Sequence, residues 1–159
     1  MDCTGHSYQI NGDIGMTCGT ERDILGCTLI ALPRYQDDRG YLVPVWSAED
    51  FPVKYMYYSM TYAGECRDKD LWHIHRHHTD RFVVLQGNLL MALSNGVDMI
   101  RLGMSGKQPQ MLVIPPGIYH CFRNYWHKDS LMCNLPSEVY DPEDEGRVPF
   151  DELGVKKPW

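Results

Sequence analysis

From Asp23 onward, short runs of apolar or alternating residues follow one another, and residues that favour turns separate them. Strands produce this pattern because successive side chains point to opposite faces of a sheet and each chain reversal needs a turn. Asn95-Gly96 is a strong hairpin signal of this kind. No window of a dozen residues has the apolar spacing of an amphipathic helix. The chain is therefore predicted to be all-β, a sandwich or barrel, with strands within Ile24–Leu32, Tyr41–Trp46, Val53–Thr61, Arg81–Gln86, Asn88–Leu93, Met99–Leu102, Gln110–Ile114, Ile118–Phe122 and Ser130–Leu135.

Two segments of different amino-acid composition flank these runs. Residues 1–22 are polar and rich in glycine, which predicts a flexible N-terminal arm. Residues 141–159 are charged and contain proline, and we expect them to form a short C-terminal extension that folds back over the strands. A chain of 159 residues suits one hydrophobic core. We therefore expect a single domain over residues 23–159.

Composition argues against several classes of function. No stretch approaches the ~20 consecutive apolar residues of a membrane span. The chain has 15 Lys and Arg against 21 Asp and Glu, and this formal net charge of −6 opposes binding to nucleic acid or anionic lipid. Six cysteines form no C-x-x-C pair, and the first residues do not resemble a secretory leader. We expect a cytoplasmic protein with reduced thiols that binds neither nucleic acid nor membranes.

The segment 72–87 is rich in histidine and leads into an apolar run. His73 and His75 are two residues apart, so on a strand both imidazoles lie on one face. Asp80 can return to that face from the next strand. A second segment, 115–124, places His120 after a Pro-Pro-Gly turn. These side chains are candidates for one shared site.

The spacing within both segments resembles the two motifs of the cupin superfamily. The first motif is met by His73, His75, Asp80 and Gly87, with aspartate at the position where glutamate is more usual; the second is met by Pro115, Gly117, His120 and Asn124. The resemblance implies a jelly-roll β-barrel.

The same residues permit two chemical interpretations. Three imidazoles and one carboxylate can bind one divalent transition metal, with Fe, Mn, Ni, Co, Cu and Zn all compatible, and His73, His75, Asp80 and His120 are the candidate ligands. Alternatively, they form a polar lining without an ion. His77 and His78 are predicted to lie in a solvated loop, with the alternative that a shift of the strand register makes either one a ligand.

Residues from about Leu32 to Trp159 also resemble the dTDP-4-dehydrorhamnose 3,5-epimerase family and its sugar-isomerase relatives. The similar segments are Asp37-Asp38-Arg39-Gly40, Ile114 to Phe122, Tyr140 to Gly146, and Phe150-Asp151. This resemblance implies a dimeric jelly roll in which His73 removes the proton next to a C4 keto group, without a metal. It also implies that Asp151 orients His73, and that a strand within Ile24–Leu32 is exchanged between or added to the sheets of a homodimer.

Three positions depart from this family. Asp70-Leu71-Trp72-His73 stands where the family has an R-G-L-H run, Asp80 aligns with a lysine, and Leu131 to Asn134 contain no tyrosine to return the proton. We consider Tyr119 or Tyr125 as replacements for that tyrosine. The residues predicted to contact the sugar-nucleotide or keto substrate are Arg39, Trp72, Arg81, His120 and Arg123.

Three functions remain open at this point. The first is a sugar-nucleotide epimerase or isomerase that acts on a 4-keto-deoxy sugar or a related carbonyl compound, with His73 as the base. The second is a metal-dependent cupin, an oxygenase, decarboxylase or isomerase that acts on a small organic acid or ketone. The third is a cupin that binds a sugar or effector without catalysis.

Overall fold

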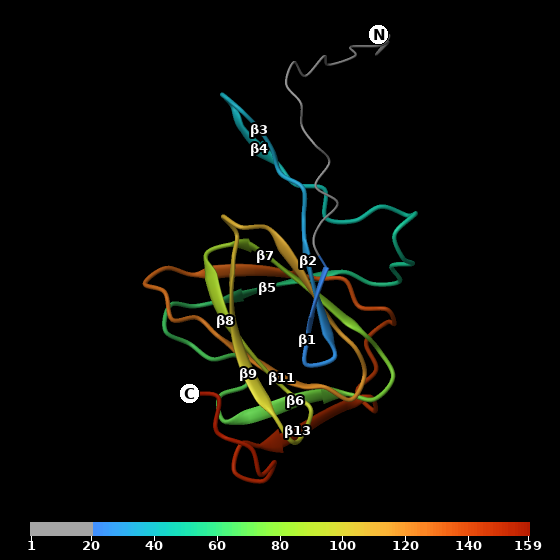
Figure 1. Ribbon diagram of the computed structural model, residues 1–159, viewed down its shortest axis with the longest axis vertical. Coiled ribbons are helices and arrows are strands. Elements are labelled where there is room, and N and C mark those ends of the chain that lie inside the picture. Colours follow the sequence, from blue (N-terminus) through green and yellow to red (C-terminus); the bar gives the residue numbers. More distant parts are fainter. Residues whose placement is uncertain (1–20) are drawn as a thin grey trace.

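The computed structural model describes residues 21–159, which form two antiparallel β-sheets facing each other (Figure 1). Residues 1–20, and with them most of the predicted N-terminal arm, lie outside the described residues. The first sheet has the order β1 (Glu21–Ile24), β2 (Cys27–Ala31), β10 (Gln110–Ile114), β7 (Asp80–Gln86), β12 (Ser130–Asn134) and β5 (Tyr57–Thr61). The second has the order β13 (Glu145–Pro149), β6 (Leu71–His75), β11 (Tyr119–Arg123), β8 (Asn88–Ser94) and β9 (Met99–Ser105).

Neighbouring strands in both sheets are mostly distant in sequence, as in a jelly roll. The prediction of an all-β jelly-roll barrel is confirmed. A small hairpin, β3 (Tyr35–Asp37) with β4 (Gly40–Leu42), projects away from the two sheets (Figure 1). Among residues 21–159, no helix is long and apolar enough to span a membrane.

The main hydrophobic core fills the space between the sheets. Phe82 and Val84 of β7 point inward from the first sheet, while Met91 and Leu93 of β8 point inward from the second. The alternate residue of β7, Val83, belongs to a separate cluster on the outer face of the first sheet. This alternation is the period of two that the sequence displays.

The C-terminal extension covers the outer face of the second sheet. Phe150 and the partly buried Trp159 pack against Trp72, whose ring lies 5.3 Å from that of Phe150 at their centroids. The predicted folding back of this segment is what the structure shows. The extension begins with β13, a strand absent from the predicted set.

Three predicted strands are shorter in the structure. The run Ile24–Leu32 is divided by a turn at residues 25–26, so that β1 ends at Ile24 and β2 covers Cys27–Ala31. The predicted run Tyr41–Trp46 ends as a strand at Leu42, and Val53–Thr61 becomes a strand only at Tyr57. Proline lacks the N–H that a sheet ladder needs. Pro44 lies within Tyr41–Trp46 and Pro52 precedes Val53–Thr61, so the chain between them forms a loop.

Candidate active site

A cavity of about 180 Å³ lies between the two sheets. His73 and His75 of β6, Asp80 of β7 and His120 of β11 all line it. Strand alternation puts the two β6 imidazoles on one face, and His120 pairs directly with His73 across the β6–β11 ladder. The volume lies below the roughly 300–1,000 Å³ of pockets that enclose drug-sized ligands, so the cavity suits one compact ring.

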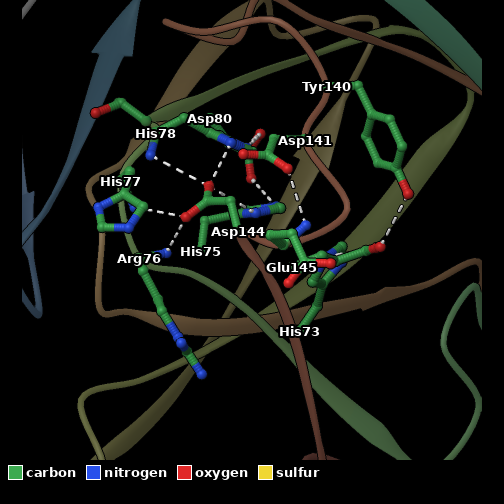
Figure 2. Close-up of polar contacts among 12 residues, drawn as sticks. His73, His75, Arg76, His77, His78, Asp80, Tyr140, Asp141, Asp144 and Glu145 are labelled. Atoms are coloured by element: carbon green, nitrogen blue, oxygen red, sulfur yellow. Dashed lines mark hydrogen bonds and ion pairs between the residues drawn. The ribbon is translucent and has the colours of Figure 1, made fainter.

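His73 lies beside a carboxylate of β13, which is its neighbour in the sheet (Figure 2). Its Nε2 is 3.0 Å from Oε1 of Glu145, and both side chains are largely buried. Glu145 also accepts a hydrogen bond of 2.7 Å from Arg147 and one of 3.3 Å from the Tyr140 hydroxyl. These contacts fix the carboxylate against the imidazole.

The charge state of His73 follows from its surroundings. Burial, together with the nearby imidazoles of His120 and His75, lowers the pKa of His73 to about 3. The ring is therefore neutral near pH 7 and has one lone pair that can accept a proton. Glu145 lies where it can stabilise the imidazolium that results.

A second group of side chains surrounds Asp80, which is 2% exposed. His75 Nε2 and His120 Nε2 lie 3.5 Å and 3.3 Å from its Oδ2, and His78 Nε2 lies 3.3 Å from its Oδ1. Asn134 donates a hydrogen bond of 2.6 Å to Oδ1. Burial alone would raise the pKa of Asp80, but the contacts with His120 and His78 hold it well below its usual range. Asp80 is therefore an anion in the barrel interior.

Asp144 holds the turn that precedes β7 (Figure 2). Its carboxylate accepts hydrogen bonds from the backbone N–H groups of Arg76, His77 and His78, at 2.8, 2.8 and 3.4 Å. It also lies 2.8 Å from Nδ1 of His78. His78 thus bridges Asp144 and Asp80, and these carboxylates raise its pKa despite its burial. The prediction that His78 lies in a solvated loop is wrong, whereas His77 is exposed.

The four candidate metal ligands do not all meet at one point. His75 and His120 approach Asp80, but Nε2 of His73 faces Glu145 instead. His73, His75 and His120 still offer nitrogen atoms within 4.8 Å of one another, and so do His75 and His78 with Asp80. The donor set suits a divalent transition metal.

Tyr57 of β5 faces the same cavity and was not among the predicted site residues. Its hydroxyl oxygen accepts a hydrogen bond of 3.0 Å from Asn134. Burial, and next the charge of Asp80, raises the pKa of Tyr57 to about 12. The phenol therefore keeps its proton at neutral pH and can donate it.

The structure does not bring Asp151 or Tyr119 to the cavity. The exposed carboxylate of Asp151 pairs with Lys157 at 2.7 Å, and the place beside His73 is taken by Glu145. Tyr119 is next to His120 in β11 and so points to the opposite face, where it packs in the cluster of Trp72. Tyr125 is exposed on the surface and lies over Arg123.

Four predicted substrate contacts also lie elsewhere. Trp72 is fully buried behind the second sheet. Arg39 pairs with Asp37 in the projecting hairpin. The other two are Arg81, which lies over the ring of Phe51 at 4.1 Å, and Arg123, 4.7 Å from the ring centre of Tyr125. His120 does line the cavity.

Sequence reasoning missed Tyr57, Glu145, Arg67 and Arg147, all of which line the cavity. A signal for Glu145 was present, because it lies in the segment Tyr140 to Gly146 that resembles the epimerase family. The two arginines carried no local signal, since they lie outside the histidine segments. They supply positive charge at the cavity that the replaced family positions lack.

Comparison with known proteins gives the chain a family context. Residues 25–149 match the family described as "FdtA: WxcM-like, C-terminal". A curated relative from Haloferax volcanii, the "Probable low-salt glycan biosynthesis epimerase Agl13", is 30% identical over 139 residues, which cover 77% of this chain and 86% of the relative.

Solved structures share the fold at lower sequence identity. NovW, a 4-keto-6-deoxy sugar epimerase from Streptomyces spheroides, superposes with a TM-score of 0.74 at 16% identity and covers 89% of this chain and 80% of its own. QdtA, a sugar 3,4-ketoisomerase from Thermoanaerobacterium thermosaccharolyticum solved in complex with TDP, has a TM-score of 0.68 at 22% identity. The match covers 80% of this chain and 90% of QdtA. A dTDP-4-dehydrorhamnose 3,5-epimerase from Sulfolobus tokodaii has a TM-score of 0.74 at 21% identity, and the match covers 89% of this chain and 87% of the epimerase. At these identities the similarity establishes a cupin-type fold.

Proposed function

The chain belongs to the WxcM-like, C-terminal family, and on this premise we propose that it is an isomerase or epimerase of a nucleotide-linked 4-keto-6-deoxy sugar. The relatives described above support the substrate class. NovW is named a 4-keto-6-deoxy sugar epimerase, QdtA a sugar 3,4-ketoisomerase, solved in complex with TDP, and the Haloferax volcanii relative a probable glycan biosynthesis epimerase. The observation that carries the proposal is the neutral imidazole of His73 beside Glu145 in a cavity the size of one ring.

Proton transfer at carbon requires a base close to an acidified C–H bond. A ketone acidifies the neighbouring C–H group because the electron pair left by the proton is delocalised onto the carbonyl oxygen. In the proposed reaction His73 takes this proton on Nδ1, since its Nε2 faces Glu145. Glu145 stabilises the imidazolium. This scheme needs no cofactor, because the ketone itself makes the proton removable.

Tyr57 is the proposed acid that returns a proton to carbon or to the enolate oxygen. Its oxygen accepts from Asn134, so its own hydrogen is directed to another partner, and its raised pKa keeps that hydrogen in place. Arg67 and Arg147 lie at the same cavity and can stabilise negative charge on the enolate or on the diphosphate of the substrate.

Solvent exchange tests the proposal directly. The protein is incubated with a dTDP-4-keto-6-deoxy-hexose in deuterium oxide, and deuterium next to the keto group is followed by NMR. We expect exchange in the native protein, its loss in His73→Asn, and native exchange in His77→Asn, because His77 is exposed on the neighbouring turn. Binding of the nucleotide sugar without exchange or conversion would instead identify a binding protein and overturn the proposed activity.

We also propose a homodimer that covers the outer face of the first sheet. A groove there is lined almost entirely by apolar side chains, among them Leu85, Leu131 and the 71%-exposed Tyr58. Large exposed apolar patches mark interaction sites. Light scattering should give twice the chain mass for the native protein and the monomer mass for Tyr58→Glu. Val97→Glu, at an exposed turn, should remain dimeric.

A cytoplasmic location is the last part of the proposal. Cys27, Cys66, Cys121 and Cys133, the cysteines among residues 21–159, are all free thiols. Reduced thiols are typical of proteins in a reducing compartment.

A further inference from the structure

Two polar side chains of the cavity take no part in the proposed proton transfer, and we propose that both bind hydroxyl groups of the sugar. They are Ser59 of β5 and Asp68, in the loop between β5 and β6. The inference rests on the proposed function, because it names the part of that substrate which the two side chains recognise. It assigns both residues to the selection of the substrate.

Asp68 is a carboxylate of the cavity without a hydrogen bond. Among residues 21–159, three carboxylates line the cavity, namely those of Asp68, Asp80 and Glu145. Asp80 accepts a hydrogen bond from Asn134, and Glu145 accepts one from Arg147. Asp68 has only an ion pair with Nε of Arg147, at 3.9 Å, which is longer than the roughly 2.7–3.2 Å of a hydrogen bond. Its oxygens therefore remain available to a ligand in the cavity.

The burial of Asp68 makes a donor from a ligand favourable. The side chain is only 13% exposed, so water solvates it poorly. Burial raises the pKa of Asp68 more than the neighbouring positive charges lower it, which means that the anion lacks part of the stabilisation it has in water. A hydroxyl group can donate the missing hydrogen bond, and hydrogen bonds to an ionised acceptor are short and strong.

Ser59 gives a second and independent observation. It is 7% exposed, and its Oγ is buried without a hydrogen-bond partner among residues 21–159. β12 is the one strand paired with β5 in the sheet, and there Met132 lies opposite Ser59 and next to Val84 of β7. Neither side chain offers a strong hydrogen-bonding group. Most buried hydroxyls in folded proteins have a partner, and a ligand hydroxyl in the cavity can supply one here.

The charges around the cavity indicate which part of the substrate these residues contact. Arg67 and Asp68 are adjacent, carry opposite charges and both line the cavity, but Arg67 is exposed whereas Asp68 is largely buried. The diphosphate of a nucleotide sugar is attracted by Arg67 and repelled by Asp68. The uncharged sugar is therefore the part expected beside Asp68. Strand alternation also places Ser59 on the same side of β5 as Tyr57, the proposed acid that acts on the sugar.

Binding of unreactive sugars tests the inference separately from turnover. The probes are dTDP-6-deoxyglucose, its 2-deoxy and 3-deoxy counterparts, and dTDP alone. None of them contains a ketone, so none reacts by the proposed scheme, and isothermal titration calorimetry gives their affinities. We expect the native chain to bind at least one of the deoxy sugars at least about tenfold more weakly than dTDP-6-deoxyglucose. Without that hydroxyl, buried polar groups of the protein stay unpaired.

Variants assign the effect to the two residues. Asp68→Ala should bind dTDP-6-deoxyglucose at least about tenfold more weakly, and Ser59→Ala about 3- to 10-fold more weakly, while both bind dTDP with native affinity. Thr61→Val is the control for Ser59→Ala, because it removes a buried hydroxyl that also lacks a partner but does not line the cavity. Asp70→Ala is the control for Asp68→Ala, since it removes an exposed carboxylate from the same loop. Both controls should bind like the native chain.

Urea unfolding distinguishes recognition from a structural role. Ser59→Ala should unfold at the urea concentration of the native chain or above it, because Oγ has no partner in residues 21–159. Earlier unfolding, or an equal loss of affinity for dTDP and for the sugar, would overturn the inference. So would equal binding of all the sugars by the native chain, which needs no variant to fold. Deuterium exchange from the ketone substrate is scored separately, and its persistence in that case would leave the proposed function standing. A chain that binds neither dTDP nor any of the sugars would overturn both.

Discussion

Replacement of Gly87 by alanine is expected to destabilise the fold strongly, because this glycine sits at a tight contact between β7, β8 and β12. Its φ is +81°, a left-handed conformation that costs other residues roughly 1–2 kcal/mol. A Cβ atom at this position would lie 2.9 Å from Cα of Ser130 and closer still to the Ser130 hydroxyl. The left-handed backbone and the close approach of Ser130 therefore explain why the first sequence motif has glycine at position 87.

The magnitude follows from what the added methyl group displaces. Ser130 is fully buried, and its hydroxyl both accepts from the N–H of Asn88 and donates to its carbonyl, at 3.0 Å each. Overpacking of this kind typically costs about 1–3 kcal/mol. Disturbing one of the hydrogen bonds adds about 1 kcal/mol. With the backbone strain, the free energy of unfolding should fall by about 3–6 kcal/mol.

Urea unfolding followed by tryptophan fluorescence measures this loss. Gly103→Ala is the matched control, because Gly103 lies in β9, has no left-handed φ, and has no atom within 4 Å of an added Cβ. We expect that control within about 1 kcal/mol of the native chain. Ser130→Gly in the Gly87→Ala background should restore part of the loss, since it removes the obstructing side chain. A Gly87→Ala chain as stable as the Gly103→Ala chain would refute the reasoning.

Three further outcomes concern the cavity. Tyr57→Phe should reduce turnover of the nucleotide sugar by about 10²- to 10⁴-fold, while deuterium exchange next to the keto group continues. The control Tyr55→Phe should turn over at the native rate. Equal loss of exchange and turnover in Tyr57→Phe would assign Tyr57 another role. Glu145→Gln should lower kcat more than it raises KM, because the carboxylate acts on the imidazolium; a change in KM alone would contradict this. The pKa values of His73 and His75 in the folded chain are lowered to about 3 and about 4, so between pH 6.5 and pH 5 both side chains are neutral when folded and protonated when unfolded. The free energy of unfolding should therefore fall by about 2 kcal/mol per histidine between neutral pH and pH 5. Urea unfolding of chelated protein measures this loss, and a stability that is constant from pH 7 to pH 5 would contradict the prediction.

Strand alternation explains both the success and the main error of the sequence-based interpretation. Period-two patterns and turn residues located most central strands, such as β7 and β10, because their buried faces are apolar. Three predicted site residues, however, are direct sequence neighbours of inward-facing residues. Trp72, Tyr119 and Arg81 adjoin His73, His120 and Asp80, and alternation sends them to the opposite face. On a strand, the residue directly next to an inward-facing site residue therefore lies on the opposite face of the sheet, away from the site.

The remaining parts of the site depend on long-range pairing that no local pattern encodes. β13 is an edge strand of mixed charge that ends in proline, so it lacks the apolar alternation of a buried strand. Its register against β6 nevertheless decides which acid reaches His73. Glu145 lies opposite His75 in that ladder, and a slip of one residue would turn its carboxylate to the outer face. The identity of the acid could thus be found only from the fold.

The contacts divide the buried histidines into two groups with different chemistry. Nε2 of His73 faces Glu145, whereas Nε2 of His75, His78 and His120 faces Asp80. One ion bound by all of them would require His73 to leave Glu145, and the base would lose the carboxylate that stabilises its protonated form. The separate groups leave Glu145 next to the proton that His73 takes up in the proposed reaction, while Asp80 contacts the other three histidines.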